Sequence, residues 1–255
     1  MGVRDSFARR LRAGEALAGT FVKSRDPATV ELLGGAGFDL LILDAEHAPM
    51  GRADLGLLLM ATRAAGVAAL VRVPAAEPWI ATALDAGAAG VMVPQVRDAD
   101  HARALVEAVR FAPTGGLGFS PSTAAGDYGR RGIAKHLAQQ PKETVLVCQI
   151  EDPQAVENAA EIAAVPGVDA LLVGPVDLAV SVGETDPQAE TVQQMCRKVI
   201  AAAAAADCAG GLFLGAPQSA PAWRGAGASL FVMGTDQGFM AKGASSALNT
   251  FRPTE

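Results

Sequence analysis

The feature of this sequence that most constrains its fold is a repeated alternation of short aliphatic runs with longer amphipathic stretches. The centres of eight runs are almost entirely Val, Ile, Leu or Phe, as expected for parallel strands that are covered on both faces. We expect strands at Ala18–Val22, Asp39–Leu43, Ala68–Arg72, Gly90–Val93, Thr144–Ile150, Asp169–Val173, Gly210–Leu214 and Ser229–Met233. We expect helices at Pro27–Ala36, Arg52–Ala65, Pro78–Ala86, Ala99–Arg110, Pro153–Val165, Pro187–Ala206, Ala216–Gly225 and Gly238–Leu248.

Eight strand-helix units in 255 residues match a (β/α)8 barrel in both number and length. An open doubly wound sheet is the alternative, but the first strand is followed by Lys23-Ser24 instead of the G-x-G-x-x-G turn, which disfavours dinucleotide binding. No linker divides the chain, so residues 1–255 are predicted to form a single domain. The long connection Phe111–Lys142 is expected to be a functional lid or to carry small helices.

Charge and composition exclude several kinds of partner. The chain has 21 Lys and Arg against 27 Asp and Glu, a net charge of −6, and no basic run, which argues against nucleic acid or an anionic membrane. The segment Met1–Ala18 lacks the apolar region of a secretory signal, and no apolar stretch is long enough to span a membrane. Three widely spaced cysteines indicate reduced thiols, with no disulfide framework and no zinc site. We therefore predict a cytoplasmic protein.

Polar residues follow the predicted strands at the points where a barrel carries its active site, the C-terminal strand ends. They are Asp44, Glu46 and His47 after the second strand, Arg72 at the end of the third, Gln95 after the fourth, Gln149 and Glu151 at the fifth, and Asp177 after the sixth. Glu151 and Asp177 follow neighbouring strands, which lie about 4.8 Å apart, so their carboxylates are placed to share one hard divalent cation. The alternative is that one carboxylate caps a helix, since Asp177 and the pair Glu151-Asp152 precede or open helical segments.

His47 and Arg72 are the other candidate site residues. His47 follows an apolar strand beside two acids, where a carboxylate can orient its ring for general-base catalysis; a structural hydrogen bond is the alternative role. Arg72 at a barrel mouth requires an anion, either Asp44 or Glu46 or a substrate carboxylate or enolate. The remaining histidines, His101 and His136, are expected on the surface.

A Schiff-base aldolase would need a desolvated lysine at the barrel mouth. Lys23 is the one lysine placed for this role. A single lysine at a strand end supports the Schiff-base mechanism less strongly than the full set of polar residues described above supports a metal site.

Four segments carry a resemblance to a known family. They are LILDAEHAP (residues 41–49), VR (71–72), CQIE (148–151) and VGPVDL (173–178). Their order and spacing resemble the HpcH/HpaI aldolases, the class II pyruvate aldolases, from Gly19 to about Phe251. The resemblance implies a barrel of the phosphoenolpyruvate/pyruvate-binding type and a metal-dependent, reversible cleavage of a 4-hydroxy-2-oxo acid to pyruvate and an aldehyde.

The resemblance also implies a role for individual residues. The implied metal ligands are Glu151 and Asp177, with Mg²⁺, Mn²⁺ or Co²⁺ as the ion. The implied substrate-binding residues are Gln149, Gly174, Val176 and Asp177. The implied catalytic residues are His47 as the base, Arg72 as the transition-state stabiliser, and Asp85 as the carboxylate that raises the basicity of the histidine, a residue that strand-end reasoning alone misses.

Assembly and acceptor preference follow from the same resemblance. Relatives commonly form homohexamers with exchanged C-terminal helices, and the segment Gly238–Leu248 is apolar enough for such packing. Leu117 stands where relatives commonly carry an arginine, which predicts a less anionic aldehyde. Alternative functions are a decarboxylase or a CoA-ester lyase acting through the same enolate, or a barrel without catalytic activity. A CoA ester would need a basic docking surface that this acidic chain lacks.

Overall fold

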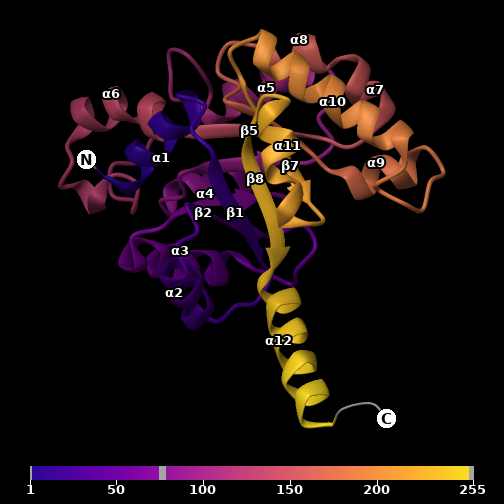
Figure 1. Ribbon diagram of the computed structural model, residues 1–255. Coiled ribbons are helices and arrows are strands. Elements are labelled where there is room, and N and C mark those ends of the chain that lie inside the picture. Colours follow the sequence, from indigo (N-terminus) through magenta and orange to yellow (C-terminus); the bar gives the residue numbers. More distant parts are fainter. Residues whose placement is uncertain (1, 75–78, 253–255) are drawn as a thin grey trace.

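The protein is a closed barrel of eight parallel strands surrounded by helices (Figure 1). The computed structural model describes residues 2–74 and 79–252. The strands pair in chain order, and β8 closes the barrel against β1. Their bounds are β1 Leu17–Val22, β2 Leu40–Asp44, β3 Ala68–Arg72, β4 Gly90–Val93, β5 Val145–Ile150, β6 Ala170–Val173, β7 Ala209–Leu214 and β8 Ala228–Thr235. All eight predicted strands are confirmed.

The helices among the described residues follow the strands, with one helix preceding β1. Their bounds are α1 Val3–Arg12, α2 Pro27–Gly35, α3 Arg52–Ala65, α4 Trp79–Asp85, α5 Ala99–Val109, α6 Ile133–Glu143, α7 Pro153–Glu157, α8 Ala159–Ala163, α9 Pro175–Ser181, α10 Glu190–Ala205, α11 Ala220–Gly225 and α12 Asp236–Phe251. Two short 3-10 turns lie at Asp127–Gly129 and Pro217–Ser219. The predicted helix start at Pro78 lies outside the described residues.

Several helices differ from the sequence-based expectation. The predicted helix Pro153–Val165 is divided into α7 and α8 at Asn158, where φ is −87° and ψ is 2°. The long connection contains α6, as expected of a segment with small helices of its own. Neither α1 nor α9 was predicted as a helix. The inner face of α1 carries Phe7 and Leu11 into the barrel core, so tertiary burial stabilises this highly charged segment.

The core has two layers, because alternate residues of each strand face the barrel interior and the surrounding helices. Leu40 and Ile42 of β2 pack in the interior cluster, whereas Leu41 and Leu43 pack outward with the helices. The same alternation makes Asp44 the next inward-facing residue, and its side chain is fully buried. The strands therefore position polar groups at the barrel mouth by continuing an inward-facing apolar series.

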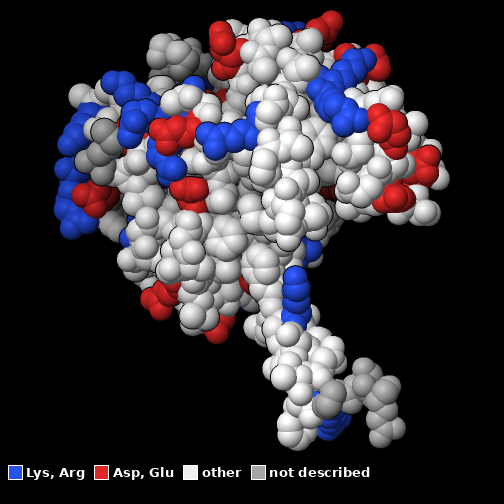
Figure 2. Space-filling model, in the orientation of Figure 1, with Lys and Arg blue, Asp and Glu red and all other residues white. Residues whose placement is uncertain are grey.

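The long C-terminal helix α12 extends away from the barrel (Figure 1). Its carboxylate Asp236 accepts hydrogen bonds from the backbone N–H groups of Lys23 at 3.0 Å and Ser24 at 2.8 Å, which ties the start of α12 to the end of β1. The surface of α12 is mostly uncharged in Figure 2. Its exposed apolar residues are Phe239, Met240, Leu248 and Phe251.

The cysteine prediction is confirmed, because Cys148, Cys196 and Cys208 are free thiols buried in the core. Burial raises the pKa of Cys196 and that of Cys208 to about 12. Among the described residues, no helix is both long enough and apolar enough to cross a membrane.

Candidate active site

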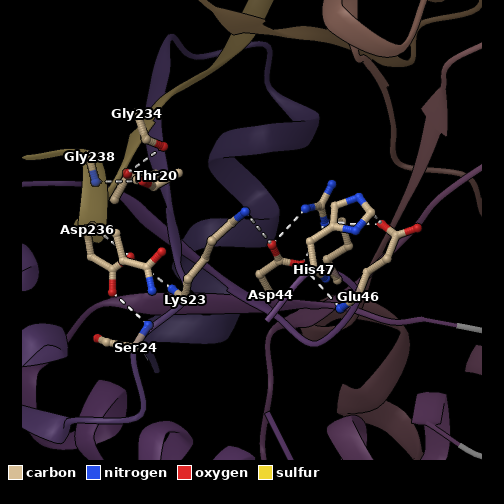
Figure 3. Close-up of polar contacts among 12 residues, drawn as sticks. Thr20, Lys23, Ser24, Asp44, Glu46, His47, Gly234, Asp236 and Gly238 are labelled. Carbon is tan, nitrogen blue, oxygen red and sulfur yellow. Dashed lines mark hydrogen bonds and ion pairs between the residues drawn. The ribbon is translucent and has the colours of Figure 1, made fainter. Parts of the chain in front are cut away.

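A row of alternating charges crosses the C-terminal mouth of the barrel. Arg72 at the end of β3 donates to both oxygens of Asp44 at the end of β2, with Nε–Oδ1 at 3.0 Å and Nη2–Oδ2 at 2.8 Å. Lys23, one residue past β1, places Nζ 3.6 Å from Asp44 Oδ2 (Figure 3). On its other side, Arg72 Nε lies 3.4 Å from Glu46 Oε2. The guanidinium carbon of Arg72 lies 4.4 Å from the centre of the Phe21 ring, so the cation has an aromatic face beneath it.

Asp44 is the fixed carboxylate of this row. Its Oδ1 accepts the backbone N–H groups of Glu46 at 3.2 Å and His47 at 3.1 Å, which sets the turn that carries both side chains. Burial by itself would raise the pKa of Asp44, but the hydrogen bonds from Arg72, the N–H of His47 and the charge of Lys23 lower it below its usual value. Asp44 is therefore ionised at neutral pH, and its role is structural, because its oxygens hold Arg72 and the turn after β2.

Glu46 and His47 are less constrained. His47 Nε2 lies 3.7 Å from Glu46 Oε2, and the imidazole side chain is 56% exposed at the mouth (Figure 3). Glu46 Oε2 is buried and accepts no hydrogen bond from the described residues, and burial raises the pKa of this carboxyl. An accessible imidazole beside a carboxylate without a hydrogen-bond donor is suited to take up a proton.

A second pair of carboxylates converges beyond β5 and β6. A Cβ added to Gly174 would lie 3.2 Å from Asp177 Oδ2 and 3.3 Å from Glu151 Oε1, so both carboxylates border the space that this glycine leaves open. Glu151 Oε2 accepts the backbone N–H of Gln95 at 3.0 Å, and Oε1 accepts the side-chain amide of Gln149. Burial first, and the charge of Asp177 second, raise the pKa of Glu151 to about 7.

This carboxylate pair fits a hard divalent cation. Two close carboxylates without a cationic partner disfavour each other's ionisation, and a metal ion would remove that penalty. Gln149 Oε1 is buried and has no hydrogen-bond partner in the described part of the chain, so a further oxygen is free beside the pair. No cluster of three or more His, Cys, Asp and Glu with ligand geometry occurs among residues 2–74 and 79–252, which is consistent with an ion that keeps waters and takes substrate oxygens.

The helix-cap alternative holds for Asp152 but not for Glu151, whose carboxylate accepts hydrogen bonds from Gln95 and Gln149 instead. The neighbouring Asp152 is the N-cap of α7 and accepts the backbone N–H of Ala155 at 2.9 Å. Asp177 lies in the first turn of α9, with Gly174 at the N-cap position. Val176, another predicted substrate-binding residue, is half-exposed in the same turn. Thus Gln149, Glu151, Gly174, Val176 and Asp177 are brought together by β5, β6 and α9.

The structure does not bring Asp85 to His47 within one chain. Asp85 ends α4, which leads into the start of β4, whereas His47 follows the end of β2; in a parallel barrel these are opposite ends. Asp85 borders a small cavity of about 10 Å³ with Leu117 and His136. Leu117 packs against the core there, so it does not flank the barrel mouth of its own chain.

The surface prediction for His136 is wrong. The side chain is buried, with its ring centroid 5.4 Å from those of both Phe111 and Phe119. Burial lowers its pKa, and Nδ1 has no hydrogen-bond partner in the described structure. The earlier part of the same long connection, with Phe111 and Phe119, folds back over this residue, which the local sequence pattern does not reveal.

Sequence reasoning placed Gln95 at the mouth but missed how it acts, and it missed Phe21 altogether. The backbone N–H of Gln95 reaches Glu151 in a conformation with a φ of +54°, which the sequence does not signal. Phe21 beneath Arg72 had a detectable signal, since it faces inward by the two-residue alternation from Leu17 and Gly19.

Comparisons with known proteins identify the family of this chain. Residues 17–242 match the family described as HpcH/HpaI aldolase/citrate lyase. The chain is 37% identical over 241 residues to the 2-dehydro-3,6-dideoxy-6-sulfogluconate aldolase of Pseudomonas putida, covering 93% of each chain. It is 34% identical over 250 residues to the 5-keto-4-deoxy-D-glucarate aldolase of Salmonella arizonae, covering 97% of each.

A solved structure extends the match to three dimensions. The crystal structure of an HpcH/HpaI aldolase/citrate lyase family protein from Burkholderia cenocepacia superposes with a TM-score of 0.91 at 35% sequence identity. The match covers 97% of this chain and 99% of that one. This chain therefore belongs to the HpcH/HpaI aldolase/citrate lyase family, and it is an enzyme that cleaves carbon–carbon bonds.

Proposed function

We propose that this enzyme is a metal-dependent class II pyruvate aldolase that cleaves a 4-hydroxy-2-oxo acid to pyruvate and an aldehyde. The observation that carries the proposal is the convergence of Glu151 and Asp177 on the space beside Gly174, at the same barrel mouth as Arg72 and His47. Aldolases are also the relatives that match nearly the full chain. These matches do not favour the decarboxylase or CoA-ester lyase.

Glu151 and Asp177 would hold the divalent ion, Mg²⁺, Mn²⁺ or Co²⁺. When bound, the ion would supply Lewis-acid polarisation of the ketone of the 2-oxo acid. The amide of Gln149 lies beside Glu151, where it would orient the ketone end of the substrate. The N–H groups of Val176 and Asp177 belong to the first turn of α9, where they would donate to the substrate carboxylate.

His47 would take the proton, and Arg72 would stabilise the negative charge that develops. His47 would remove the proton from the 4-hydroxyl, and Glu46 beside it would stabilise the imidazolium that forms. The C3–C4 bond then breaks, the aldehyde carbonyl forms, and the bonding electrons become those of the pyruvate enolate. Arg72 would donate to the oxygen that gains this charge, and a proton returned to C3 completes pyruvate.

Asp85 can assist His47 only across a contact between copies of the chain, since the two lie at opposite ends of one barrel. We propose that the protein forms a homo-oligomer, a hexamer by family resemblance. The exposed apolar residues of α12 support this proposal, because a projecting apolar helix gains stability by packing against another copy. We likewise propose a cytoplasmic location.

The decisive experiment is an aldolase assay with metal removed and restored. We expect condensation of pyruvate with aldehydes, and cleavage of the products, to be lost after exhaustive treatment with EDTA and restored by Mn²⁺ or Mg²⁺. Borohydride should trap no pyruvate on Lys23, because its ammonium group faces Asp44 instead of an apolar pocket. Activity that survives chelation, together with trapping at Lys23, would contradict the metal mechanism.

The His47→Ala variant tests the proposed base. We expect its turnover to fall about 100-fold or more, because the proton on the 4-hydroxyl loses its acceptor. Metal affinity, measured by titration calorimetry with Mn²⁺, should stay unchanged, since the exposed imidazole is not one of the proposed metal ligands. An undiminished rate would remove His47 from the base role.

A further inference from the structure

Lys23 carries a positive charge at the barrel mouth, and its ammonium group has an ion pair but no hydrogen bond among the described residues. Its Nζ lies 3.6 Å from Asp44 Oδ2, which is an ion pair but longer than a hydrogen bond. In the described part of the chain, this ammonium group donates no hydrogen bond, although it has three donors. Its side chain is 26% exposed at the mouth.

Asp44 does not need Lys23 to satisfy its hydrogen bonds. Both of its oxygens accept from Arg72, and Oδ1 also accepts two backbone N–H groups. A buried carboxylate already paired in a bidentate manner gains little from a second, more distant cation. The donors of Lys23 are therefore available to a group that enters from outside.

The position of Lys23 determines which part of a substrate it meets. In a closed barrel of eight strands, β1 lies four strands from β5 in either direction, so Lys23 lies across the mouth from Glu151. Arg72, at the end of β3, pairs with Asp44 beside Lys23, and its charge also acts on Glu151 at the end of β5. A substrate with its 2-oxo acid end beside Glu151 and its reacting carbons near Arg72 would extend its aldehyde half toward β1.

We propose that Lys23 is a specificity-determining residue that binds an anionic group, a carboxylate or another acidic end group, on the aldehyde half of the substrate. The inference rests on the proposed aldolase function. It differs from the preference for a less anionic aldehyde expected from Leu117, which within one chain packs beside Asp85 and away from the mouth. Lys23 supplies at the mouth a cation that Leu117 does not.

The backbone around Lys23 is held firmly enough to aim its side chain. Its N–H donates to Asp236, and so does that of Ser24, so the start of α12 holds the turn after β1 (Figure 3). The hydroxyl of Thr20 on the same strand donates to the carbonyl of Gly234 at 3.2 Å. A preorganised cation loses less conformational entropy when it binds an anion.

The test is a comparison of matched aldehydes that differ only in charge: glyoxylate against acetaldehyde, and succinic semialdehyde against butanal. We expect the wild-type enzyme, loaded with Mn²⁺ and pyruvate, to show the higher kcat/KM for the anionic member of at least one pair. In Lys23→Met this ratio should fall about 10- to 100-fold, mainly through KM of the anionic aldehyde, because a charge-assisted hydrogen bond is lost. Lys23→Arg keeps the cation and should retain most of the preference.

Arg25 offers a matched control, since it is an exposed cation two residues further along the same connection. Arg25→Met should leave the ratio unchanged. Equal losses for both members of each pair in Lys23→Met would assign Lys23 to the support of Asp44 and overturn the inference, as would a wild-type enzyme that does not discriminate. Absence of condensation with all four aldehydes would instead contradict the proposed function itself.

Discussion

Replacing Arg72 by alanine is expected to lower the rate of carbon–carbon cleavage by about 100- to 1,000-fold, the loss typical of removing a preorganised donor from a developing oxyanion. Turnover with saturating Mn²⁺ measures this effect. The protein should also lose about 3–5 kcal/mol of its free energy of unfolding, because the buried charge of Asp44 loses its bidentate partner. Urea unfolding measures that second effect.

A double variant separates the two losses. Asp44→Asn combined with Arg72→Ala removes the buried carboxylate charge together with its partner, so most of the stability should return. The catalytic rate should not return, since no donor then faces the oxygen that gains charge. Recovery of both in the double variant would assign Arg72 a structural role only.

The second large effect is expected from Glu151→Gln, which should abolish metal-dependent cleavage and yet stabilise the metal-free protein at pH 8. The folded-state pKa of Glu151 is about 7, against an ordinary value of 4.5, so its ionisation costs free energy in the folded protein. The cost develops between pH 4.5 and 7 and is fully present above 7. We expect the neutral variant to be more stable at pH 8 by about 3 kcal/mol, and the difference to vanish below pH 4.5.

The local hydrogen bonds permit this substitution. The carbonyl oxygen of Gln at position 151 can accept the N–H of Gln95, and its amide can donate to Oε1 of Gln149 once the Gln149 amide, which now faces Glu151 with Nε2, turns over by 180°. Asp152→Asn is the matched control, because it neutralises the adjacent carboxylate while keeping an N-cap residue for α7. Thermal unfolding in EDTA, repeated with Mn²⁺, should show stabilisation by metal in the wild type and in Asp152→Asn but not in Glu151→Gln. Stabilisation of all three by Mn²⁺ would place the metal elsewhere.

The carboxylate pair and Arg72 were predictable from sequence for a physical reason. Strands in a barrel alternate inward and outward, so a polar residue that follows an inward-facing apolar series lies at the mouth; Asp44 follows Leu40 and Ile42 in this way. Neighbouring strands of a parallel barrel end at the same face, which brings Glu151 and Asp177 together. Both arguments need only local periodicity and strand order.

By itself, the sequence determined the eight strands, the barrel and the polar set at its mouth, because each depends on hydrophobic patterns within short segments. Only the tertiary structure decided the partners of those residues. It placed Asp85 at the opposite end from His47, buried His136 against Phe111 and Phe119 of the same long connection, and paired Lys23 with Asp44 of the adjacent strand. These contacts join segments far apart in the chain, and their distances depend on how the barrel closes and how its connections fold back, which no local pattern encodes.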